Sequence, residues 1–267
     1  MKIHRTAVVD PSVRIGKDVE IGPYAIIDAD VELGDGVRIE AHAMVKSYVR
    51  VGAHTRIFSG AVVGEIPQDL KFNGEVSEVI IGEGVQIREF VTINRGTRAS
   101  GRTIIGDHSL LMAYVHVAHD CIIGKHCTLS NCVQLAGHVE VGDYVVMGGM
   151  SAVHQFVKIG AHVMIGGGAL VRTDVPPFVK VGKEPLRYMG VNIQGLKRRG
   201  FSEQDRRQIE AVYEQLFIRH SNIQRAMEAI EKRQPENPWW PIIKAFLMRS
   251  RQGDRGIIKG MHNYRNA

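Results

Sequence analysis

Histidines beside an acidic residue are the clearest candidates for chemistry in this 267-residue chain. The segment 112–121 reads MAYVHVAHDC and contains His116, His119 and Asp120. An imidazole next to a carboxylate suits general-base catalysis, because the carboxylate orients the ring and fixes its tautomer. His119 is therefore the candidate base, and His154 in the segment AVHQF is a further candidate for the site.

The same histidines leave a metal site open. His116 and His119 are three residues apart, and His138 and His154 follow. Three imidazole nitrogens are a known ligand set for catalytic zinc. Spacing alone does not separate a zinc hydratase from an enzyme that uses histidine as a base.

Signals for phosphate and nucleic-acid binding are incomplete. The segment 82–84 (GEG) lacks the third glycine of a dinucleotide-binding fingerprint. Lys197, Arg198 and Arg199 form a basic run that suits a phosphate group, but no interleaved aromatic residues or DNA-binding motif accompany it. We expect no nucleic-acid partner.

The elements that must hold these residues follow a six-residue period. Counting in sixes from Val9 to Val171 gives 28 positions, of which 24 are Ile, Leu or Val and one is Met. A helix would show a period near 3.6 and a plain strand a period of two. A period of six predicts short strands joined by turns, three to a triangular coil of about 18 residues, stacked as a parallel β-helix.

The interior of such a prism is filled by aliphatic and small side chains, among which we place Cys121 and Cys127. Two polar insertions, near 64–78 and 94–102, interrupt the repeat and are expected to form loops on one face. A site must therefore lie outside the prism, where a loop, the C-terminal region or a second subunit supplies the opposite wall. Six histidines share the turn phase of the repeat and are expected to be solvated: His42, His54, His108, His126, His138 and His162.

The pattern becomes helical beyond about residue 190. Ser202 predicts a helix N-terminus, and two further helices are expected, one after Ser221 or Asn222 and one that opens at Asn237–Pro238. We divide the chain into a β-helix over 1–190 and an α-helical domain over 191–267.

Charge divides the chain in nearly the same place. Residues 1–180 carry 17 basic and 19 acidic side chains, whereas residues 181–267 carry 17 and 9. The basic C-terminal part predicts an acidic ligand or partner. Its tail from Gly253 is rich in glycine and basic residues and is expected to be loosely held.

Compartment signals indicate the cytoplasm. The N-terminal residues lack the apolar stretch of a secretory signal, and no segment is long and apolar enough to predict a transmembrane helix. The three cysteines, an odd number without such a signal, suit a reducing compartment.

A set of ordered motifs makes the chain resemble one family, the bacterial UDP-N-acetylglucosamine O-acyltransferases that begin lipid A synthesis. The resemblance covers nearly the whole chain. It is more specific than the hexapeptide repeat, which alone indicates only a broad acyltransferase superfamily. The motifs are GEIPQDLKF at 64–72, HVAHDC at 116–121, LAGHV at 135–139, AVHQF at 152–156 and GLKRRGF at 195–201.

The resemblance implies a left-handed parallel β-helix that assembles as a homotrimer. It implies transfer of an (R)-3-hydroxyacyl group from acyl carrier protein to the 3-hydroxyl of UDP-N-acetylglucosamine. It also implies no metal and no bound cofactor, because the acyl donor is a phosphopantetheine thioester on acyl carrier protein.

The family's site residues fall on matching positions of this sequence. The resemblance implies that His119 is the general base with Asp120 beside it, and that the Gly137 N–H stabilises the oxyanion. The acyl-length ruler falls on Gly167, where the missing side chain predicts a longer acyl chain. The sugar and acyl head would be held by Asp69, Lys71, His116 and His138. The nucleotide and acyl region would be lined by His154 and Gln155. The uridine diphosphate would meet Asn192, Gln194, Arg198 and Arg199.

Charge alone suggests Arg206, Arg207 and Arg219 as contacts for the acidic carrier protein. Three alternatives stay open: an amino-sugar nucleotide acceptor that would give an amide, a zinc-dependent β-helix hydratase, and a β-helix scaffold without enzymatic activity. The sequence does not determine the acyl chain length, the acceptor atom or the regulation.

Overall fold

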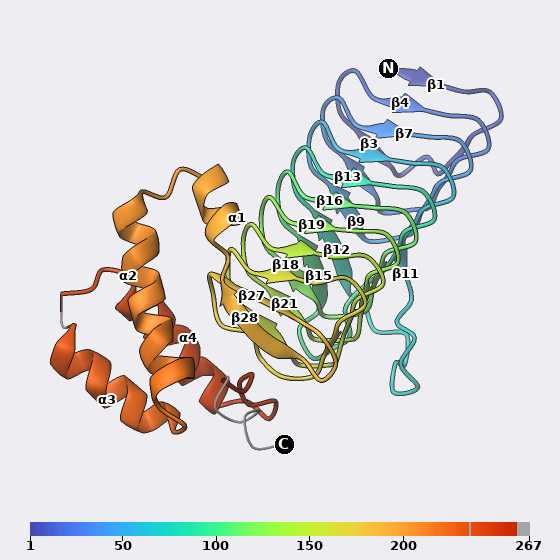
Figure 1. Ribbon diagram of the computed structural model, residues 1–267. Helices are drawn as coiled ribbons and strands as arrows, with labels where there is room; N and C mark the ends of the chain where they lie inside the picture. The colour runs from blue at the N-terminus through green and yellow to red at the C-terminus, as the bar shows by residue number, and fades with distance from the viewer. Residues whose placement is uncertain (235, 261–267) are drawn as a thin grey trace.

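The structure is a computed structural model that describes residues 1–234 and 236–260. Short strands lie in three sheets wound around one axis as a three-sided prism (Figure 1). Helices follow the last coils, and the N-terminus lies at the opposite end of the prism. The prediction of a mainly β chain, a left-handed parallel β-helix followed by helices, is confirmed.

Each sheet collects every third strand of the prism. Sheet 1 consists of β1 (Lys2–Ile3), β4 (Glu20–Ile21), β7 (Arg38–Ile39), β10 (Arg56–Ile57), β13 (Gln86–Ile87), β16 (Leu110–Leu111), β19 (Thr128–Leu129), β22 (Val146–Met147), β25 (Met164–Ile165), β27 (Val179–Gly182) and β28 (Arg187–Val191). Sheet 2 consists of β2 (Val8–Val9), β5 (Ile26–Ile27), β8 (Met44–Val45), β11 (Val62–Glu65), β14 (Thr92–Asn94), β17 (His116–Val117), β20 (Gln134–Leu135), β23 (Ala152–Val153) and β26 (Leu170–Val171). Sheet 3 consists of β3 (Arg14–Ile15), β6 (Glu32–Leu33), β9 (Val49–Val51), β12 (Glu78–Ile81), β15 (Arg102–Ile105), β18 (Ile122–Ile123), β21 (Glu140–Val141) and β24 (Lys158–Ile159).

The strand register sets the coil length at 18 residues wherever no insertion intervenes. Leu111 pairs with Leu129, and His116 pairs with Gln134, in parallel ladders. Residues 18 apart therefore lie one above the other at the same place on the prism.

In a two-residue strand the second side chain points into the prism and the first points out. Ile123 is 1% exposed, whereas its neighbour Ile122 is 44% exposed. The prediction that Cys121 and Cys127 are core residues is confirmed, because both are buried. Burial raises the pKa of both thiols to about 12, so they stay protonated and unreactive at neutral pH.

The turns between strands place non-glycine residues in the left-handed backbone region. At the turns between sheet 3 and sheet 1, φ is +55° at His126 and +59° at both Tyr144 and His162. These rings stack in a column, with centroids 4.8 Å apart for His126 and Tyr144 and 4.9 Å apart for Tyr144 and His162. The prediction that these turn histidines are solvated is confirmed for His126, which is exposed, and wrong for His162, which is half-buried.

The C-terminal region begins where β28 ends at Val191. Across the described residues, none of the helices combines the length and the apolar composition needed to cross a bilayer. The helices are α1 (Ile193–Arg198), α2 (Glu203–Glu214), its π-helical continuation η1 (Gln215–Arg219), α3 (Ile223–Arg233) and α4 (Trp240–Arg251).

Two of the three predicted helix starts are confirmed. Ser202 caps α2 in a capping box with Asp205, and Asn222 caps α3. The third was placed too early, because Asn237 forms a turn before α4. Its side-chain oxygen accepts the Trp239 N–H at 3.0 Å, and α4 begins one residue later.

The chain beyond α4 returns to the prism. The Asp174 N–H donates to the Gly256 carbonyl at 2.8 Å, and the Asp174 carbonyl accepts the Ile258 N–H at 3.0 Å. Ile258 is buried. The tail from Gly253 is thus held to the last coil, contrary to the prediction, and its end at 261–267 lies outside the described residues.

We expect Ile123→Ala to lower the free energy of unfolding by roughly 2–5 kcal/mol, because it empties a filled position in the prism interior. The neighbouring Ile122→Ala should change it by less than about 0.5 kcal/mol, since that side chain points out. Urea unfolding of the two variants measures the difference. Equal losses would contradict the assignment of inward and outward positions.

Stability should fall as the pH drops from about 6.5 to 4, in part because of His162. Burial first, and the nearby Arg199 guanidinium second, lower its pKa to about 4, with Asp143 opposing. In this window the unfolded chain, with a histidine pKa near 6.5, binds more protons than the folded chain.

The variant His162→Phe tests this contribution, because phenylalanine keeps the stack on Tyr144 and removes the titration. Urea unfolding at several pH values between 4 and 7 should show a shallower loss of stability than in the parent chain. An unchanged slope would show that His162 does not drive it.

Candidate active site

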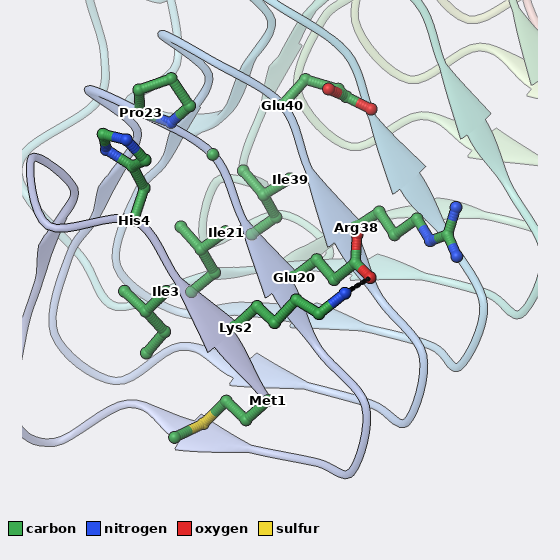
Figure 2. Close-up of a pocket in the computed structure, with 11 residues that line it drawn as sticks. Met1, Lys2, Ile3, His4, Glu20, Ile21, Pro23, Arg38, Ile39 and Glu40 are labelled. Atoms are coloured by element: carbon green, nitrogen blue, oxygen red, sulfur yellow. Dashed lines mark ion pairs between the residues drawn. The ribbon is translucent and has the colours of Figure 1, made fainter.

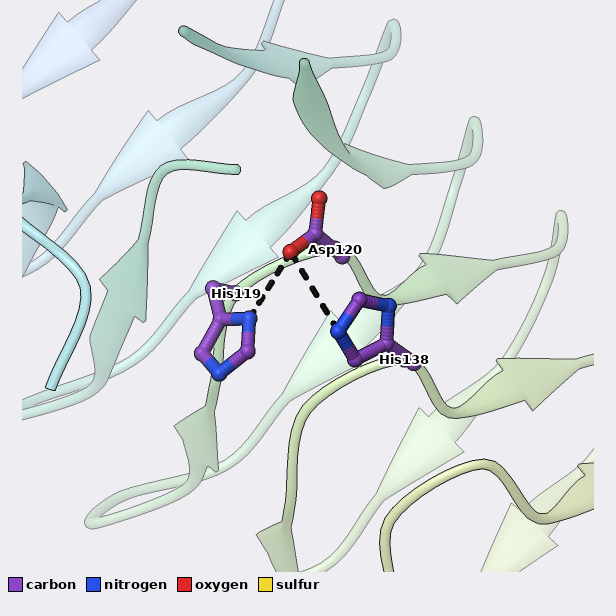
Figure 3. Close-up of side chains that lie close together, drawn as sticks. All are labelled: His119, Asp120 and His138. Carbon is purple, nitrogen blue, oxygen red and sulfur yellow. Dashed lines mark hydrogen bonds and ion pairs between the residues drawn. The ribbon is translucent and has the colours of Figure 1, made fainter. Parts of the chain in front are cut away.

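The sequence motifs meet on one edge of the prism because successive coils align them. β17, β20 and β23 lie next to one another in sheet 2. The turn after β17 carries His119 and Asp120, and the turn after β20 carries His138, directly beside them (Figure 3). Asp120 and His138 both adopt the left-handed conformation of these turns, with φ of +60° and +61°.

His119 and Asp120 form a hydrogen-bonded pair. His119 Nδ1 lies 2.8 Å from Asp120 Oδ2, and only 8% of the His119 surface is exposed. Because an ionised carboxylate only accepts hydrogen bonds, the proton in this bond belongs to Nδ1. Nε2 of His119 therefore carries the lone pair and can take a proton from a bound hydroxyl.

Asp120 is ionised even though its side chain is 0% exposed. Burial raises its pKa, but hydrogen bonds from His119, Ser100 and Thr97 outweigh burial and hold the pKa well below its usual value. Thr97 donates its N–H at 3.1 Å and its hydroxyl at 2.8 Å, and Ser100 donates its N–H at 3.3 Å and its hydroxyl. The Asp120 N–H in turn donates to Thr103 Oγ1 at 2.9 Å.

Two further histidines flank the pair in their neutral form. His138 Nε2 lies 3.7 Å from Asp120 Oδ2, beyond hydrogen-bond distance, and its ring meets His119 edge-on. Burial lowers the pKa of His138, although the charge of Asp120 opposes the change. Burial also lowers the pKa of His116, whose Nδ1 lies 2.7 Å from Thr92 Oγ1. Neutral imidazoles of this kind can both donate to and accept from a polar ligand.

Gly137 packs against the free nitrogen of His119. A Cβ at position 137 would lie 2.7 Å from Nε2, so any other residue would push the ring aside. In the described part of the chain no acceptor takes the Gly137 N–H, whereas the corresponding amide of Lys125 donates to Asp143 at 2.8 Å. Gly137 therefore offers an unpaired donor next to the candidate base.

The same three side chains could also supply metal ligands. One ligand atom each from His119, Asp120 and His138 lie within 4.8 Å of one another. The Asp120 oxygens, however, already accept hydrogen bonds from His119, Thr97 and Ser100, which a cation would have to displace. The donor set fits a hydrogen-bonded pair better than a zinc centre.

Both insertions leave the prism at this same edge, between sheet 2 and sheet 3. The first joins β11 to β12 and protrudes beside β11 (Figure 1), and the second joins β14 to β15. The Asn94 side chain donates to the Ile66 carbonyl at 2.7 Å, and the Arg98 N–H donates to Glu75 at 3.1 Å. The two loops are therefore bonded to each other next to the dyad of His119 and Asp120.

Asp69 and Lys71 belong to the first insertion. The Asp69 carboxylate accepts the Lys71 N–H at 3.0 Å. Its charge acts to raise the pKa of His138, so it lies within electrostatic reach of the dyad. Lys71 is exposed, and within the described residues its ammonium group contacts none of the site histidines.

His154 and Gln155 lie on the same edge, one coil beyond His138 and two coils beyond the dyad. His154 is exposed, and its Nδ1 lies 3.4 Å from the Gln155 carbonyl. The next residue, Phe156, stacks on His138 with ring centroids 4.6 Å apart. This coil therefore extends the face that carries the dyad.

Residues expected to meet the uridine diphosphate lie on a different edge, between sheet 3 and sheet 1. Arg199 donates to the Tyr144 carbonyl at 2.8 Å and lies over the Tyr144 ring. The Asn192 side chain caps α1 and donates to the His162 carbonyl at 2.9 Å. Both polar atoms of the Asn192 side chain thus form hydrogen bonds where the prism meets the helices, one to the prism and one to α1.

The remaining expected residues are also separated from the dyad. Gln194 and Arg198 are exposed on α1. Gly167 lies on the third edge, between sheet 1 and sheet 2, where an added Cβ would approach only the Gly149 backbone, at 3.3 Å. A single chain does not bring His119, the α1 residues and Gly167 together.

The three arginines suggested as carrier-protein contacts are engaged within the chain. Arg207 pairs with Glu203, Arg219 pairs with Glu214, and Arg206 donates to a loop carbonyl. Exposed ion pairs of this kind are worth about 0–1 kcal/mol, so an acidic partner could compete for them.

A hollow of about 570 Å³ lies at the N-terminal end of the prism (Figure 2). Lys2, Ile3 and Glu20 are among its walls, and Lys2 pairs with Glu20 at 3.5 Å. It contains none of the residues singled out by the motifs. Because no coil covers the first one, aliphatic residues such as Ile3, 40% exposed, line open space there.

Sequence reasoning missed Thr97, Ser100 and Thr103. They lie in or just after the insertion 94–102, for which the sequence predicts only a loop on one face. Its polar composition was the available signal. Only the conformation of the loop shows that its donors reach Asp120.

Family models match most of the chain. The model described as UDP N-acetylglucosamine O-acyltransferase, domain 2, matches residues 174–258. The bacterial transferase hexapeptide model matches residues 102–137, and a model for the GMPPB C-terminal domain matches residues 2–104.

Relatives match over nearly the full length. The chain is 58% identical over 252 residues to the acyl-[acyl-carrier-protein]–UDP-N-acetylglucosamine O-acyltransferase of Chlorobaculum parvum, covering 94% of this chain and 96% of the relative. It is 63% identical over 231 residues to the enzyme of the same name from Aquifex aeolicus, covering 86% and 88%. The solved UDP-N-acetylglucosamine acyltransferase of Bacteroides fragilis aligns with a TM-score of 0.93 at 42% identity, covering 96% and 100%. The chain therefore belongs to the UDP-N-acetylglucosamine O-acyltransferase family of acyltransferases.

Proposed function

We propose that this chain transfers an (R)-3-hydroxyacyl group from acyl carrier protein to the 3-hydroxyl of UDP-N-acetylglucosamine, the first step of lipid A synthesis. Family membership supports the reaction class, and the printed names of the relatives specify these two substrates for those proteins. The observation that carries the proposal is the His119–Asp120 pair, which leaves Nε2 of His119 as a free base against Gly137.

In the proposed mechanism, the sugar oxygen attacks the thioester carbon while its proton passes to His119 Nε2. The oxyanion that forms accepts a hydrogen bond from the Gly137 N–H. The carbon–sulfur bond then breaks, and the proton on His119 passes to the departing thiolate, which leaves as the free phosphopantetheine thiol. General-base catalysis contributes roughly 10²–10⁴ in rate, and a fixed oxyanion donor roughly 10²–10³.

Asp120 takes no proton in this scheme. It holds the His119 ring in the tautomer that leaves Nε2 free, and its charge stabilises the imidazolium while that cation exists. The remaining residues take binding roles. The sugar and acyl head are assigned to Asp69, Lys71, His116 and His138, the nucleotide and acyl region to His154 and Gln155, and the uridine diphosphate to Asn192, Gln194, Arg198 and Arg199.

A homotrimer is the assembly that we propose. His119, Arg199 and Gly167 lie on three different edges of one prism, so one set of substrates can touch all three only where prisms meet. Three prisms around a three-fold axis bring unlike edges together at every interface. Gly167 of one chain would then border the acyl group held by the His119 of another, and its missing side chain leaves room for a long acyl chain.

The proposal needs no metal and no resident cofactor, because phosphopantetheine arrives on the carrier protein. The basic C-terminal part, with 17 basic and 9 acidic residues over 181–267, suits an acidic carrier protein and a diphosphate. A cytoplasmic location fits the free thiols of Cys121, Cys127 and Cys132.

The purified chain should form acylated UDP-N-acetylglucosamine from 3-hydroxyacyl carrier proteins, with a preference for the longer chains tested and no loss in the presence of a chelator. His119→Ala should lower kcat roughly 10²–10⁴-fold, because the general base is gone. Mass spectrometry of the product measures both. Product with only a 3-amino sugar nucleotide would indicate the amide-forming alternative, and chelator-sensitive activity would indicate a metal enzyme.

Gly137→Ala should lower kcat by about 10²-fold or more while the chain still folds, because the added methyl group displaces the His119 ring. Steady-state kinetics and circular dichroism check the two parts. The clash with the ring should also lower the thermal midpoint. The double variant with His119→Ala is the matched control, because without the ring the alanine should lower the midpoint no further. A fully active Gly137→Ala enzyme would show that His119 does not work from this position.

A further inference from the structure

The insertion 94–102 encloses the carboxylate on which His119 depends. Thr97 and Ser100 together direct two backbone N–H groups and two hydroxyls at Asp120. His119 Nδ1 supplies a further hydrogen bond. The site motifs contain neither Thr97 nor Ser100, yet these two residues provide most of the hydrogen bonds that keep the buried charge in place.

The hydroxyl protons of the loop can be assigned from the contacts. Thr97 Oγ1 accepts the Ala99 N–H at 3.2 Å, so its own proton is available for Asp120 Oδ2 at 2.8 Å. Ser100 Oγ lies near both the Arg102 carbonyl and Asp120 Oδ1, and it has one proton to give. The contact with Asp120 is the shorter one. Without a proton between them, Ser100 Oγ and the charged Asp120 Oδ1 would repel each other, so the hydroxyl proton points to Asp120.

The loop stabilises the charge with dipoles instead of a cation. Within the described residues, the only basic side chains within 4.0 Å of the Asp120 carboxylate are the imidazoles of His119 and His138. Arg95, in the same insertion, lies instead over the rings of Tyr48 and Phe72. In the proposed mechanism, the cation that Asp120 faces is the imidazolium formed when His119 takes the hydroxyl proton.

The loop itself is held firmly enough to position these donors. Thr97 is 7% exposed, and its carbonyl accepts the Gly101 N–H at 2.7 Å, which closes the loop on itself. The Ser77 hydroxyl donates to the Gly96 carbonyl and ties the loop to the first insertion.

We propose that Thr97 and Ser100 are positioning residues that set the orientation and proton affinity of His119 through Asp120. This inference rests on the proposed function for its kinetic consequences. Removing the Thr97 hydroxyl leaves a lone pair of Asp120 unshared, so the carboxylate holds the proton of the imidazolium more tightly. A larger fraction of His119 is then protonated at a given pH, which moves the acid limb. Asp120, held by fewer hydrogen bonds, also orients the ring less firmly, which lowers kcat.

The test compares Thr97→Val, which keeps the shape and the backbone N–H, with Thr97→Ser, which keeps the hydroxyl. Thr97→Val should lower kcat about 10- to 100-fold, the range expected when a hydrogen bond to a charged group is lost, with the KM for UDP-N-acetylglucosamine within about twofold. The acid limb of kcat/KM should move to higher pH. Thr97→Ser should restore both, and Ser100→Ala should behave like Thr97→Val.

Thr55→Val is the matched control. Thr55 is buried like Thr97. It donates to the Gly82 carbonyl at 2.9 Å and accepts the Val85 N–H at 3.1 Å, but it lies away from the dyad. The control should lose stability as Thr97→Val does while keeping the kcat and the pH profile of the parent enzyme. The same effects in Thr55→Val and Thr97→Val would overturn the proposal, as would failure of Thr97→Ser to restore activity.

A readout without substrate separates this inference from the proposed function. The ¹³Cε1 resonance of His119, identified by its loss in His119→Ala, can be titrated by NMR in each variant. A midpoint moved to higher pH in Thr97→Val but not in Thr55→Val supports the positioning role, even if the parent chain fails to acylate UDP-N-acetylglucosamine. An unmoved midpoint overturns it, even if the parent chain is active.

Discussion

The aliphatic stack inside the prism is the constraint on which the rest of the structure depends. Each coil must return to the same three edges, because its inward side chains pack on those of the coils before and after it. Residues 18 apart consequently lie at the same place on the prism, as His116 and Gln134 do in sheet 2. This alignment makes one site of three motifs that are far apart along the chain. It also confines polar chemistry to the outside.

The outer edge between sheet 2 and sheet 3 holds a charge that the fold must stabilise locally. Asp120 is withdrawn from water, and an uncompensated buried carboxylate is strongly unfavourable. Two insertions at that edge break the regular repeat, and the second one surrounds the carboxylate with hydrogen-bond donors. The edge at which the repeat is irregular is thus also the edge that carries the dyad of His119 and Asp120. Surface loops on a rigid scaffold commonly have this role.

The architecture could be predicted from the sequence because the six-residue period reports burial directly. The inward residues, the core cysteines and the capping of α2 by Ser202 all depend on local pattern. The donors from Thr97 and Ser100 could not be predicted, because the conformation of a loop without a period decides what its side chains reach. The tail that bonds to Asp174 was missed for a similar reason: its composition indicates mobility, while the open edge of the last coil supplies partners for its backbone.

The three-sided prism also limits which insertions and deletions the chain can accept without moving residues from one edge to another. Removing six residues from a regular coil would leave the aliphatic pattern unbroken, yet would rotate every earlier coil by a third of a turn relative to the edge that carries His119. The two insertions cause no such rotation, because each leaves and rejoins the prism between the same pair of sheets. Val51 therefore still pairs with Ile81, and Ile81 with Ile105. Such a chain can grow by loops that return to the same edge or by whole coils, whereas a change of six or twelve residues within the regular coils would exchange its faces.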